Sequence, residues 1–522
     1  MKILVADEIS GKGISLLRDS GHDIDVLTGL KEEELAGIIE AYDALIVRSN
    51  ARVTDKVISA SRLQVIGRAG VGVDNIDLET ATAKGILVMN APSGNIVSTA
   101  ELTIALMFSL LRNVATADRT MKEERWEKKK LIGRQLGNKT LGIVGLGRVG
   151  AEVAKRAKAL GMILLAHDPF ISPELAEKLD VRLVSLDTLL AESDIVTIHT
   201  VLNSQTRNMI GREQLARMKA SAYLINAARG GIVNEEALCE ALLEKRISGA
   251  ALDVYTQEPP TNWKLVKLEN CLSTPHLGAS TWEAQEEVGY EIAEQIALYL
   301  SQGIVKNAVN LPAPLDPELI PYLDLAGKLG MIAIQLARRS VRAIEVKCSG
   351  EITGRDVKIL VAGAVAGVLT PIVAEGNVNL INALNIARTR EINVVSVTSE
   401  ASPKFKNLME VTISSDDSSC SIAGTYFPDK GLRVVQVQGH DVEFEPRGIY
   451  LFTEHNDRPG VIGEVGTLLG QNNINIARMD VARDQPRGSA VMILNLDDEI
   501  PPDILQKLKA SPNINEVTQI LL

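Results

Sequence analysis

The sequence has few cysteines, no apolar run long enough to cross a bilayer and no excess of positive charge. Its 522 residues include four cysteines, which are widely separated and form no C-x-x-C pair: Cys239, Cys271, Cys348 and Cys420. This spacing argues against a disulfide framework or a zinc site and predicts buried thiols in a reducing compartment. We therefore expect a cytoplasmic protein without a bound metal.

Other absences narrow the class of partner. One uncharged run, residues 359–374, has only 16 residues, whereas about 20 span a bilayer, so we expect a buried helix that ends near Pro371. The first seven residues have the pattern of a strand with an early acid rather than that of a signal peptide. The net charge of −11 disfavours nucleic acid and acidic membranes as partners.

The chain is too long for a single hydrophobic core. Domains usually hold roughly 100 to 200 residues, so this length predicts three or four of them. In the first hundred residues, short apolar strands alternate with helical patterns, which predicts a parallel sheet covered by helices. The strands are expected at 3–6, 44–47, 65–67 and 87–89, and the helices at 13–20 and 31–41.

A second unit of the same kind contains a glycine-rich turn. The apolar run 141–144 leads directly into Gly145, Gly147 and Gly150, which have G-x-G-x-x-G spacing. Gly145 allows a tight turn, Gly147 lets the backbone approach a pyrophosphate, and Gly150 lets the following helix pack closely. Further elements of this unit are expected at 98–112, 151–160, 195–198, 223–226 and 249–253.

An acidic residue at a suitable distance supports a dinucleotide site and selects the cofactor. A second apolar run ends near Asp168, about 20 residues after the glycines, where a carboxylate can bind the adenosine ribose hydroxyls. The 2′-phosphate of NADP would repel this carboxylate and would need a cation, but Pro169, Phe170 and Ile171 supply none. The predicted cofactor is therefore NAD. The alternative is a glycine-bearing turn in a sheet that binds no dinucleotide.

The composition changes after residues 311–314, which contain two prolines and have the pattern of a linker. Residues 316–446 predict a mixed α/β segment with strands at 343–346 and 394–398. The last residues predict a ferredoxin-like βαββαβ unit. Its elements are expected at 449–454, 461–471, 474–482, 489–496, 502–510 and 514–521.

Three residues with suitable chemistry follow strands of the second unit. Arg229 lies just past one strand, where a guanidinium can bind a carboxylate through two parallel hydrogen bonds. Glu258 and His276 follow in later loops. Each alone could be an ordinary surface or turn residue, but their order after a dinucleotide unit favours a catalytic set. His199 is the rival base, and we expect it beside the cofactor because its loop has no acid comparable to Glu258.

Together these motifs resemble the D-isomer-specific 2-hydroxyacid dehydrogenases, whose Arg, Glu and His set matches Arg229, Glu258 and His276 in order. Segments 67–75, 95–101 and 275–281 and the C-terminal units resemble the long-form phosphoglycerate dehydrogenase branch. The resemblance implies an α/β fold with two doubly wound Rossmann-like units, a mixed α/β intervening domain similar to allosteric substrate-binding domains, and an ACT regulatory domain. The implied domains are 1–97 with 282–310 (substrate-binding), 98–281 (NAD-binding), 311–446 (intervening) and 447–522 (ACT).

The resemblance also implies an activity, namely NAD-dependent oxidation of D-3-phosphoglycerate to 3-phosphooxypyruvate at the entry to L-serine synthesis. His276 would remove the hydroxyl proton, Glu258 would orient the imidazole and stabilise its cation, and Arg229 would hold the carboxylate and polarise the C2 oxygen. The residues implied to surround the cofactor are Val71, Gly145, Gly147, Arg148, Val149, Gly150, Asp168, Thr200, Ala227, Asp253, Gly278 and Ala279.

A phosphorylated substrate needs cations besides Arg229. Arg48, which precedes Ser49, and Arg68 lie at strand ends of the first unit and are expected to contact the phosphate. Lys128 matches a basic position of the family that reaches a neighbouring subunit's site, although a run of lysines is usually a solvated helix end. Some family members carry another arginine where this chain has Asn50.

The C-terminal unit carries a candidate effector site. His455, Asp457 and Asn475 match positions at which related ACT domains hold serine across a paired interface. The plainer alternatives are a helix cap for Asp457 and a turn residue for Asn475. The resemblance thus makes L-serine a candidate effector, and edge strands that pair between subunits favour a homodimer or homotetramer.

Two other functions fit part of the pattern. Another D-2-hydroxyacid dehydrogenase, such as a glyoxylate or hydroxypyruvate reductase, would have no need of the phosphate-binding cations Arg48 and Arg68. A non-enzymatic, NAD-binding corepressor would keep the glycine turn and the catalytic-looking set. The ACT-like tail and the lack of a long disordered interaction tail argue against the corepressor.

Overall fold

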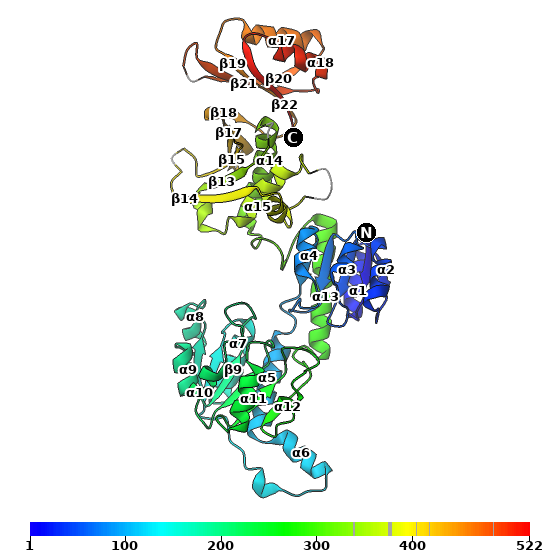
Figure 1. Ribbon diagram of the computed structural model, residues 1–522, viewed down its shortest axis with the longest axis vertical. Helices are drawn as coiled ribbons and strands as arrows, with labels where there is room; N and C mark the ends of the chain where they lie inside the picture. Colours follow the sequence, from blue (N-terminus) through cyan, green and yellow to red (C-terminus); the bar gives the residue numbers. More distant parts are fainter. Residues whose placement is uncertain (338–339, 374–377, 403, 417, 484) are drawn as a thin grey trace.

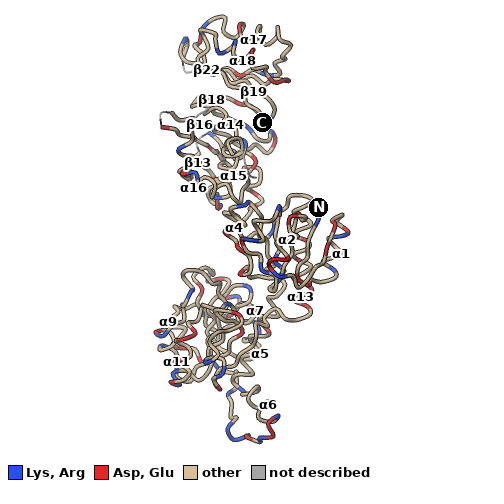
Figure 2. The backbone as a smooth tube through the Cα atoms, turned by 45° about the vertical axis from the view of Figure 1, so that its right-hand side comes forward, with Lys and Arg blue, Asp and Glu red and all other residues tan. Residues whose placement is uncertain are grey.

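The polypeptide folds into four bodies, each built around one β-sheet, and the first body lies between the second and the third (Figure 1). This computed structural model describes residues 1–522 except 338–339, 374–377, 403, 417 and 484. Basic and acidic residues are interspersed over the described parts of all four bodies (Figure 2).

The first body is a parallel sheet in the order β2-β1-β3-β4-β5. Its helices lie on both faces, because successive side chains of a strand point to opposite sides. Ile3 and Val5 pack with α1 and α13, whereas Leu4 packs with α2 and α3. The elements are β1 (Lys2–Val5), α1 (Gly11–Asp19), β2 (Asp23–Val26), α2 (Glu32–Ile38), a 3-10 turn (Ile39–Ala41), β3 (Ala44–Val47), α3 (Asp55–Ser59), β4 (Val65–Arg68), α4 (Leu78–Ala83), β5 (Leu87–Asn90) and α13 (Trp282–Gln302).

The second body is a parallel sheet in the order β12-β11-β10-β9-β6-β7-β8, the doubly wound arrangement of dinucleotide-binding folds. Helices α5, α7 and α8 cover one face, and α9 to α12 cover the other. The strands are β6 (Thr140–Val144), β7 (Ile163–His167), β8 (Arg182–Leu183), β9 (Ile195–Ile198), β10 (Tyr223–Asn226), β11 (Gly249–Leu252) and β12 (Cys271–Ser273). The helices are α5 (Ile96–Leu111), α7 (Arg148–Ala159), α8 (Pro173–Lys178), α9 (Leu186–Glu192), α10 (Arg212–Arg217), α11 (Glu235–Leu243) and α12 (Trp263–Val266).

Two helices join these bodies. The chain enters the second body through α5 and returns through α13, which packs against α1 of the first body. After α5, an arm containing α6 (Val114–Lys122) and a 3-10 turn (Lys128–Lys130) extends away from the first body (Figure 1). The arm carries several exposed apolar side chains: Val114, Met121, Trp126 and Ile132.

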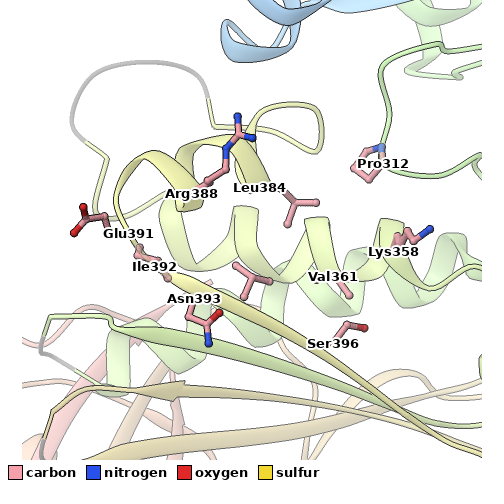
Figure 3. Close-up of a pocket in the computed structure, with 10 residues that line it drawn as sticks. Pro312, Lys358, Val361, Leu384, Arg388, Glu391, Ile392, Asn393 and Ser396 are labelled. Atoms are coloured by element: carbon pink, nitrogen blue, oxygen red, sulfur yellow. The ribbon is translucent and has the colours of Figure 1, made fainter. Parts of the chain in front are cut away.

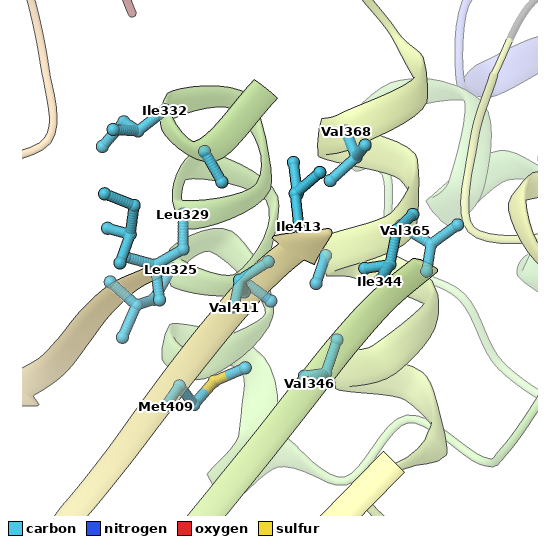
Figure 4. Packing of buried hydrophobic residues seen from close by; sticks show 14 of the residues in the cluster. Leu325, Leu329, Ile332, Ile344, Val346, Val365, Val368, Met409, Val411 and Ile413 are labelled. Carbon is cyan, nitrogen blue, oxygen red and sulfur yellow. The ribbon is translucent and has the colours of Figure 1, made fainter. Parts of the chain in front are cut away.

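The third body is a mixed sheet in the order β14-β13-β15-β16-β17-β18, and α14 and α15 pack on it (Figure 4). Its strands are β13 (Ala343–Gly350), β14 (Asn393–Ser399), β15 (Asn407–Ser414), β16 (Ser419–Phe427), β17 (Gly431–Val437) and β18 (His440–Phe444). Its helices are α14 (Ile320–Ala337), α15 (Lys358–Leu369) and α16 (Ala383–Thr389), with 3-10 turns at Pro317–Leu319 and Glu351–Gly354. The sequence predicted only β13 and β14 of these strands.

The apolar stretches of the third body form its core. The expected buried helix is α15, which ends before Pro371; Ala374, the last residue of that uncharged run, lies outside the described residues. The helix Pro317–Ala337 is long and apolar enough to cross a membrane by length and composition, but more than half of its apolar window is buried in the protein. A pocket of about 780 Å³ lies beside α15, α16 and β14 (Figure 3).

The fourth body has the predicted ferredoxin-like order. Its antiparallel sheet, β20-β21-β19-β22, carries α17 and α18 on one face. The elements are β19 (Ile449–Asn456), α17 (Val461–Gln471), β20 (Ile476–Arg483), β21 (Ser489–Leu496), α18 (Pro502–Lys509) and β22 (Ile514–Leu521). The opposite face packs into the core of the third body through Tyr450, Phe452, Val491, Ile493 and Ile520.

Candidate active site

The three glycines of the second body have three different structural roles. Gly145 has φ +92°, a conformation that L side chains rarely adopt, and it makes the turn after β6. A Cβ on Gly147 would meet nothing within 4 Å, so this glycine leaves open space at the N-terminus of α7. A Cβ on Gly150 would lie 2.1 Å from the carbonyl oxygen of Gly145, so only glycine lets α7 pack this closely. This cradle fits a pyrophosphate against the helix N-terminus.

Asp168 lies at the end of β7 beside this turn. Its Oδ2 accepts a hydrogen bond from the Leu146 N–H at 2.8 Å, and its Oδ1 accepts one from the Phe170 N–H at 2.9 Å. The backbone thus fixes the carboxylate next to the glycine turn, where it fits the ribose hydroxyls of NAD. Phe170, the second residue after Asp168, has an exposed side chain.

The other residues expected near the cofactor come from the start of α7 and from the loops after five strands. Arg148 and Val149 begin α7, and Arg148 Nη1 lies 3.3 Å from the Pro92 carbonyl oxygen of the first body. Thr200 lies just after β9 and packs against Gly145. A Cβ built on Gly145 would lie 2.9 Å from the Thr200 nitrogen. The remaining expected residues also follow strands: Val71 after β4, Ala227 after β10, Asp253 after β11, and Gly278 and Ala279 after β12.

Glu258 and His276 form a hydrogen-bonded pair. The distance between Glu258 Oε2 and His276 Nδ1 is 2.7 Å, and Glu258 Oε1 accepts a hydrogen bond from the Tyr255 N–H at 3.1 Å. Burial acts to raise the pKa of Glu258, but the hydrogen bond and charge of His276, the Tyr255 N–H and the charge of Arg229 together hold this pKa below its usual value. The carboxylate therefore stays ionised beside an imidazole whose Nε2 has no hydrogen bond to the described residues.

Asp253 fixes the loop that carries His276. Its side chain is fully buried. One carboxylate oxygen accepts hydrogen bonds from the Thr274 hydroxyl at 2.6 Å and the Leu277 N–H at 2.7 Å, and the other accepts one from the Gly278 N–H at 3.0 Å. Burial raises the pKa of Asp253 despite these hydrogen bonds. The sequence suggested contact with the cofactor and gave no sign of this structural role.

Arg48, Arg68 and Arg229 bring three positive charges to one region of the molecule. Burial first, and then the charges of Arg229 and Arg48, lower the pKa of Arg68 to about 10, although Asp74 and Asp7 act in the opposite direction. The Nε of Arg68 is buried without a hydrogen-bond partner among the described residues. Arg229 lies close enough to Glu258 to lower the pKa of that carboxyl. Several guanidinium groups in one region can hold a multiply charged anion.

Two side chains fix the loop after β3 that carries Arg48 and Ser49. Asp7 Oδ2 accepts hydrogen bonds from the N–H groups of Arg48 at 2.7 Å and Ala51 at 3.1 Å. Asn75 Nδ2 donates to the carbonyl oxygens of the same two residues. Sequence reasoning missed both, because a loop acid or amide after a strand has no distinctive pattern.

Lys128 lies in the 3-10 turn of the arm, which extends away from the first body (Figure 1). Its expected contact with the substrate site of a neighbouring subunit stays a prediction.

His199, the rival base, directly follows β9. Burial lowers the pKa of His199 to about 3, and its Nε2 lies 2.9 Å from the Thr197 hydroxyl. A ring that resists protonation is a poor acid–base group, which favours His276 over His199.

The three expected effector residues do not lie together in one chain, because Asn475 is far from Asp457. Asp457 follows the end of β19 that pairs with Ser489, whereas Asn475 precedes the β20 residue that pairs with Leu496, at the opposite end of the sheet. A strand of eight residues separates these ends by roughly 25 Å. His455 is 2% exposed, and its Nδ1 has no hydrogen-bond partner among the described residues.

Comparison with known proteins gives the family. Residues 104–278 match the D-isomer specific 2-hydroxyacid dehydrogenase NAD binding domain, residues 318–438 the D-3-phosphoglycerate dehydrogenase intervening domain, and residues 449–513 the ACT domain. D-3-phosphoglycerate dehydrogenases of Archaeoglobus fulgidus and Methanocaldococcus jannaschii are each 44% identical to this chain, with 100% of both sequences covered. The chain belongs to the D-3-phosphoglycerate dehydrogenase family. The family member of Bacillus subtilis is 38% identical, with 99% of both chains covered.

Solved structures agree with the fold of the first two bodies. A protein of Thermus thermophilus is 36% identical with a TM-score of 0.54, and the match covers 59% of this chain and 100% of that one. An NAD-dependent formate dehydrogenase of Staphylococcus aureus, solved with NAD, is 30% identical with a TM-score of 0.53, and the match covers 59% of this chain and 98% of that one. The predicted family, fold class and cofactor, NAD, are confirmed, whereas the individual site residues and domain boundaries stay predictions.

Two glycine substitutions should separate cofactor binding from folding. Gly147→Ala adds a methyl group in open space, so we expect a folded protein whose NADH dissociation constant rises about tenfold, because the methyl group occupies the phosphate cradle. Gly150→Ala forces α7 away from the Gly145 carbonyl. For this variant we expect the free energy of unfolding to fall by about 1–3 kcal/mol, in addition to weaker NADH binding. NADH fluorescence titration and thermal unfolding measure the two effects. Equal loss of stability in both variants would contradict this division.

Proposed function

We propose that this chain oxidises D-3-phosphoglycerate to 3-phosphooxypyruvate with NAD as the acceptor, the first step of L-serine biosynthesis. The proposal rests on the position of Arg229, whose charge acts both on Glu258 of the acid–base pair and on Arg68, which also senses the charge of Arg48. A substrate with a carboxylate at one end and a phosphate at the other supplies anions that can bind these guanidinium groups. The names of full-length relatives support the same substrate.

The mechanism follows from the groups around C2 of the substrate. Arg229 binds the carboxylate through parallel hydrogen bonds and polarises the C2 oxygen. His276, in the neutral form whose Nδ1–H donates to Glu258, accepts the hydroxyl proton at Nε2 as the C2–O bond becomes a carbonyl. Glu258 stabilises the resulting imidazolium through its negative charge. The glycine cradle and Asp168 would hold NAD, which would supply the acceptor for the hydride that leaves C2.

The arginines distinguish this proposal from the two alternatives. A glyoxylate or hydroxypyruvate reductase needs one guanidinium for the substrate carboxylate, and it has no use for the buried, unpaired Nε of Arg68. A corepressor that binds NAD without turnover has no use for an ionised Glu258 held against His276. Substrate turnover therefore decides among the three functions.

The first test is NADH formation by the purified protein with NAD at alkaline pH, using D-3-phosphoglycerate, D-glycerate and D-lactate in parallel. We expect oxidation of the phosphorylated acid only. Arg68→Met should lower kcat/KM for this acid by about 100-fold, since a buried charged contact is worth about 2–3 kcal/mol. Arg18→Met, at an exposed position on α1, is the matched control. Preference for an unphosphorylated acid would contradict the substrate, and absence of turnover would favour the corepressor.

The Glu258–His276 pair predicts a loss of rate when the charge of Glu258 is removed. Glu258→Gln keeps an acceptor for the His276 Nδ1–H but removes the charge that stabilises the imidazolium formed during oxidation. We expect kcat for oxidation to fall at least about tenfold. Glu258→Asp, which keeps the charge, should retain more of the rate than Glu258→Gln. A Glu258→Gln enzyme as fast as the unmodified one would refute this pairing.

We also propose L-serine as an effector held between ACT units of two chains. Within one chain, Asn475 lies at the opposite end of the sheet from His455 and Asp457, so a second copy is needed to complete such a site. Exposed apolar side chains on the arm, including Trp126 at 78% exposure, favour a further contact between copies in a homodimer or homotetramer. Lys128 on the same arm would then reach the substrate site of the neighbouring chain.

Sedimentation velocity with and without L-serine tests this effector proposal together with the oligomer. We expect a species larger than the monomer in both conditions and a lower oxidation rate with serine. Asn475→Ala should remove the response of the rate to serine. A monomer that still responds to serine would contradict a site shared between two chains.

We propose a cytoplasmic location for this enzyme. The four cysteines are free and buried, as the sequence predicted, and burial raises the pKa of Cys271 to about 11 and of Cys348 and Cys420 to about 12. Buried, protonated thiols suit a reducing compartment. Cell fractionation with an antibody against the chain tests the location.

A further inference from the structure

Asp74 places a carboxylate against the guanidinium of Arg229. Asp74 Oδ2 lies 3.9 Å from Arg229 Nε. Both groups lie over the backbone of Gly72, because a Cβ built there would be 2.6 Å from Arg229 Nη2 and 2.7 Å from Asp74 Oδ2. The two side chains therefore meet at one point, on the loop that follows β4 and Arg68.

The same carboxylate also acts on Arg68. The charge of Asp74 raises the pKa of Arg68, against the combined effect of burial and the other two arginines. Asp7 acts in the same direction, but its Oδ2 is committed to two backbone N–H groups and its side chain is buried. Asp74 differs, since its side chain is 80% exposed and no described residue donates a hydrogen bond to its carboxylate. It is the acidic group here that can move away without leaving a buried group unpaired.

We propose that Asp74 acts as a substitute anion, which partly neutralises Arg229 and Arg68 until the substrate displaces it. The proposal rests on the assignment of these two arginines to the substrate. Facing guanidinium groups repel one another, and the Asp74 carboxylate reduces this repulsion in the empty site. A carboxylate or phosphate of the substrate competes for the same guanidinium groups and must displace Asp74 to bind them.

This competition has a consequence for specificity. A substrate with two anionic ends contacts several guanidinium groups at once, so it displaces Asp74 readily. Inorganic phosphate contacts fewer guanidinium groups and has a smaller binding free energy. Competition with Asp74 therefore removes a larger fraction of the binding free energy of phosphate than of the substrate. Asp74 thus makes the site selective for an anion that spans the arginines.

The test is the affinity of the complex with NADH for D-3-phosphoglycerate, a combination in which oxidation cannot proceed. Exposed ion pairs contribute little, so calorimetric titration of Asp74→Asn should give a dissociation constant about two- to fivefold lower than that of the unmodified protein. Inorganic phosphate, used as a competing ligand, should also bind more tightly. Asp74→Glu, which keeps the charge, should not tighten binding.

Two further variants make the outcome unambiguous. Asp19→Asn removes an exposed charge from the same body and controls for net charge, so tighter binding by this variant would overturn the proposal. Weaker or unchanged binding by Asp74→Asn would overturn it as well. Arg68→Met, in the same titration, distinguishes failure of the substrate site from failure of the proposed role of Asp74. If Arg68→Met leaves the affinity unchanged, the assignment of the site is wrong; if it weakens binding while Asp74→Asn does not tighten it, only the role of Asp74 is wrong.

Discussion

The carbonyl oxygen of Gly278 accepts the hydrogen bonds on which the geometry of the site depends. It accepts from the hydroxyls of Ser98 at 2.7 Å and Thr99 at 3.1 Å, both on the helix α5 that joins the two parallel sheets. The N–H of the same residue donates to buried Asp253. The backbone of this one residue therefore couples the loop that carries His276 to the helix that connects the two bodies. Since Arg68 comes from the first body and His276 from the second, this coupling sets how the two halves of the site meet.

The C-terminal half is joined to the first body by packing and hydrogen bonds. The third and fourth bodies share one hydrophobic core, and Gln335 of α14 donates to the Leu521 carbonyl and accepts from the Leu521 N–H. On the other side, Asn379 donates to the carbonyl oxygen of Gly85, which lies just before β5. A continuous set of contacts thus runs from the ACT sheet to the first sheet. Such continuity is a requirement for coupling between sites, although coupling also needs two alternative arrangements.

Features that are set within one short segment could be predicted from the sequence. Features that depend on the arrangement of several helices and strands could not. The roles of Gly145 and Gly150 follow from spacing alone, because the turn and the close packing are made within one strand–turn–helix unit. Strands β15 to β18 were missed, since antiparallel strands within a mixed sheet give only short, irregular alternation. The separation of Asp457 from Asn475 depends on strand order, which no local motif encodes. The contact of Asp74 with Arg229 joins two bodies and leaves no trace in the residues around either.

The half-buried guanidinium of Arg68, whose Nε is buried, explains how the site can favour a highly charged substrate. Removing a cation from water without a full partner is unfavourable, and the lowered pKa of Arg68 reflects this cost. The cost is present before any ligand binds, so an anion that reaches the buried group gains more than it would at an exposed arginine. A carboxylate bound to Arg229 offsets the repulsion between the two guanidinium groups but leaves Arg68 desolvated. A second anionic group on the same molecule can pair with Arg68 itself, which makes the distance between carboxylate and phosphate part of what the protein recognises.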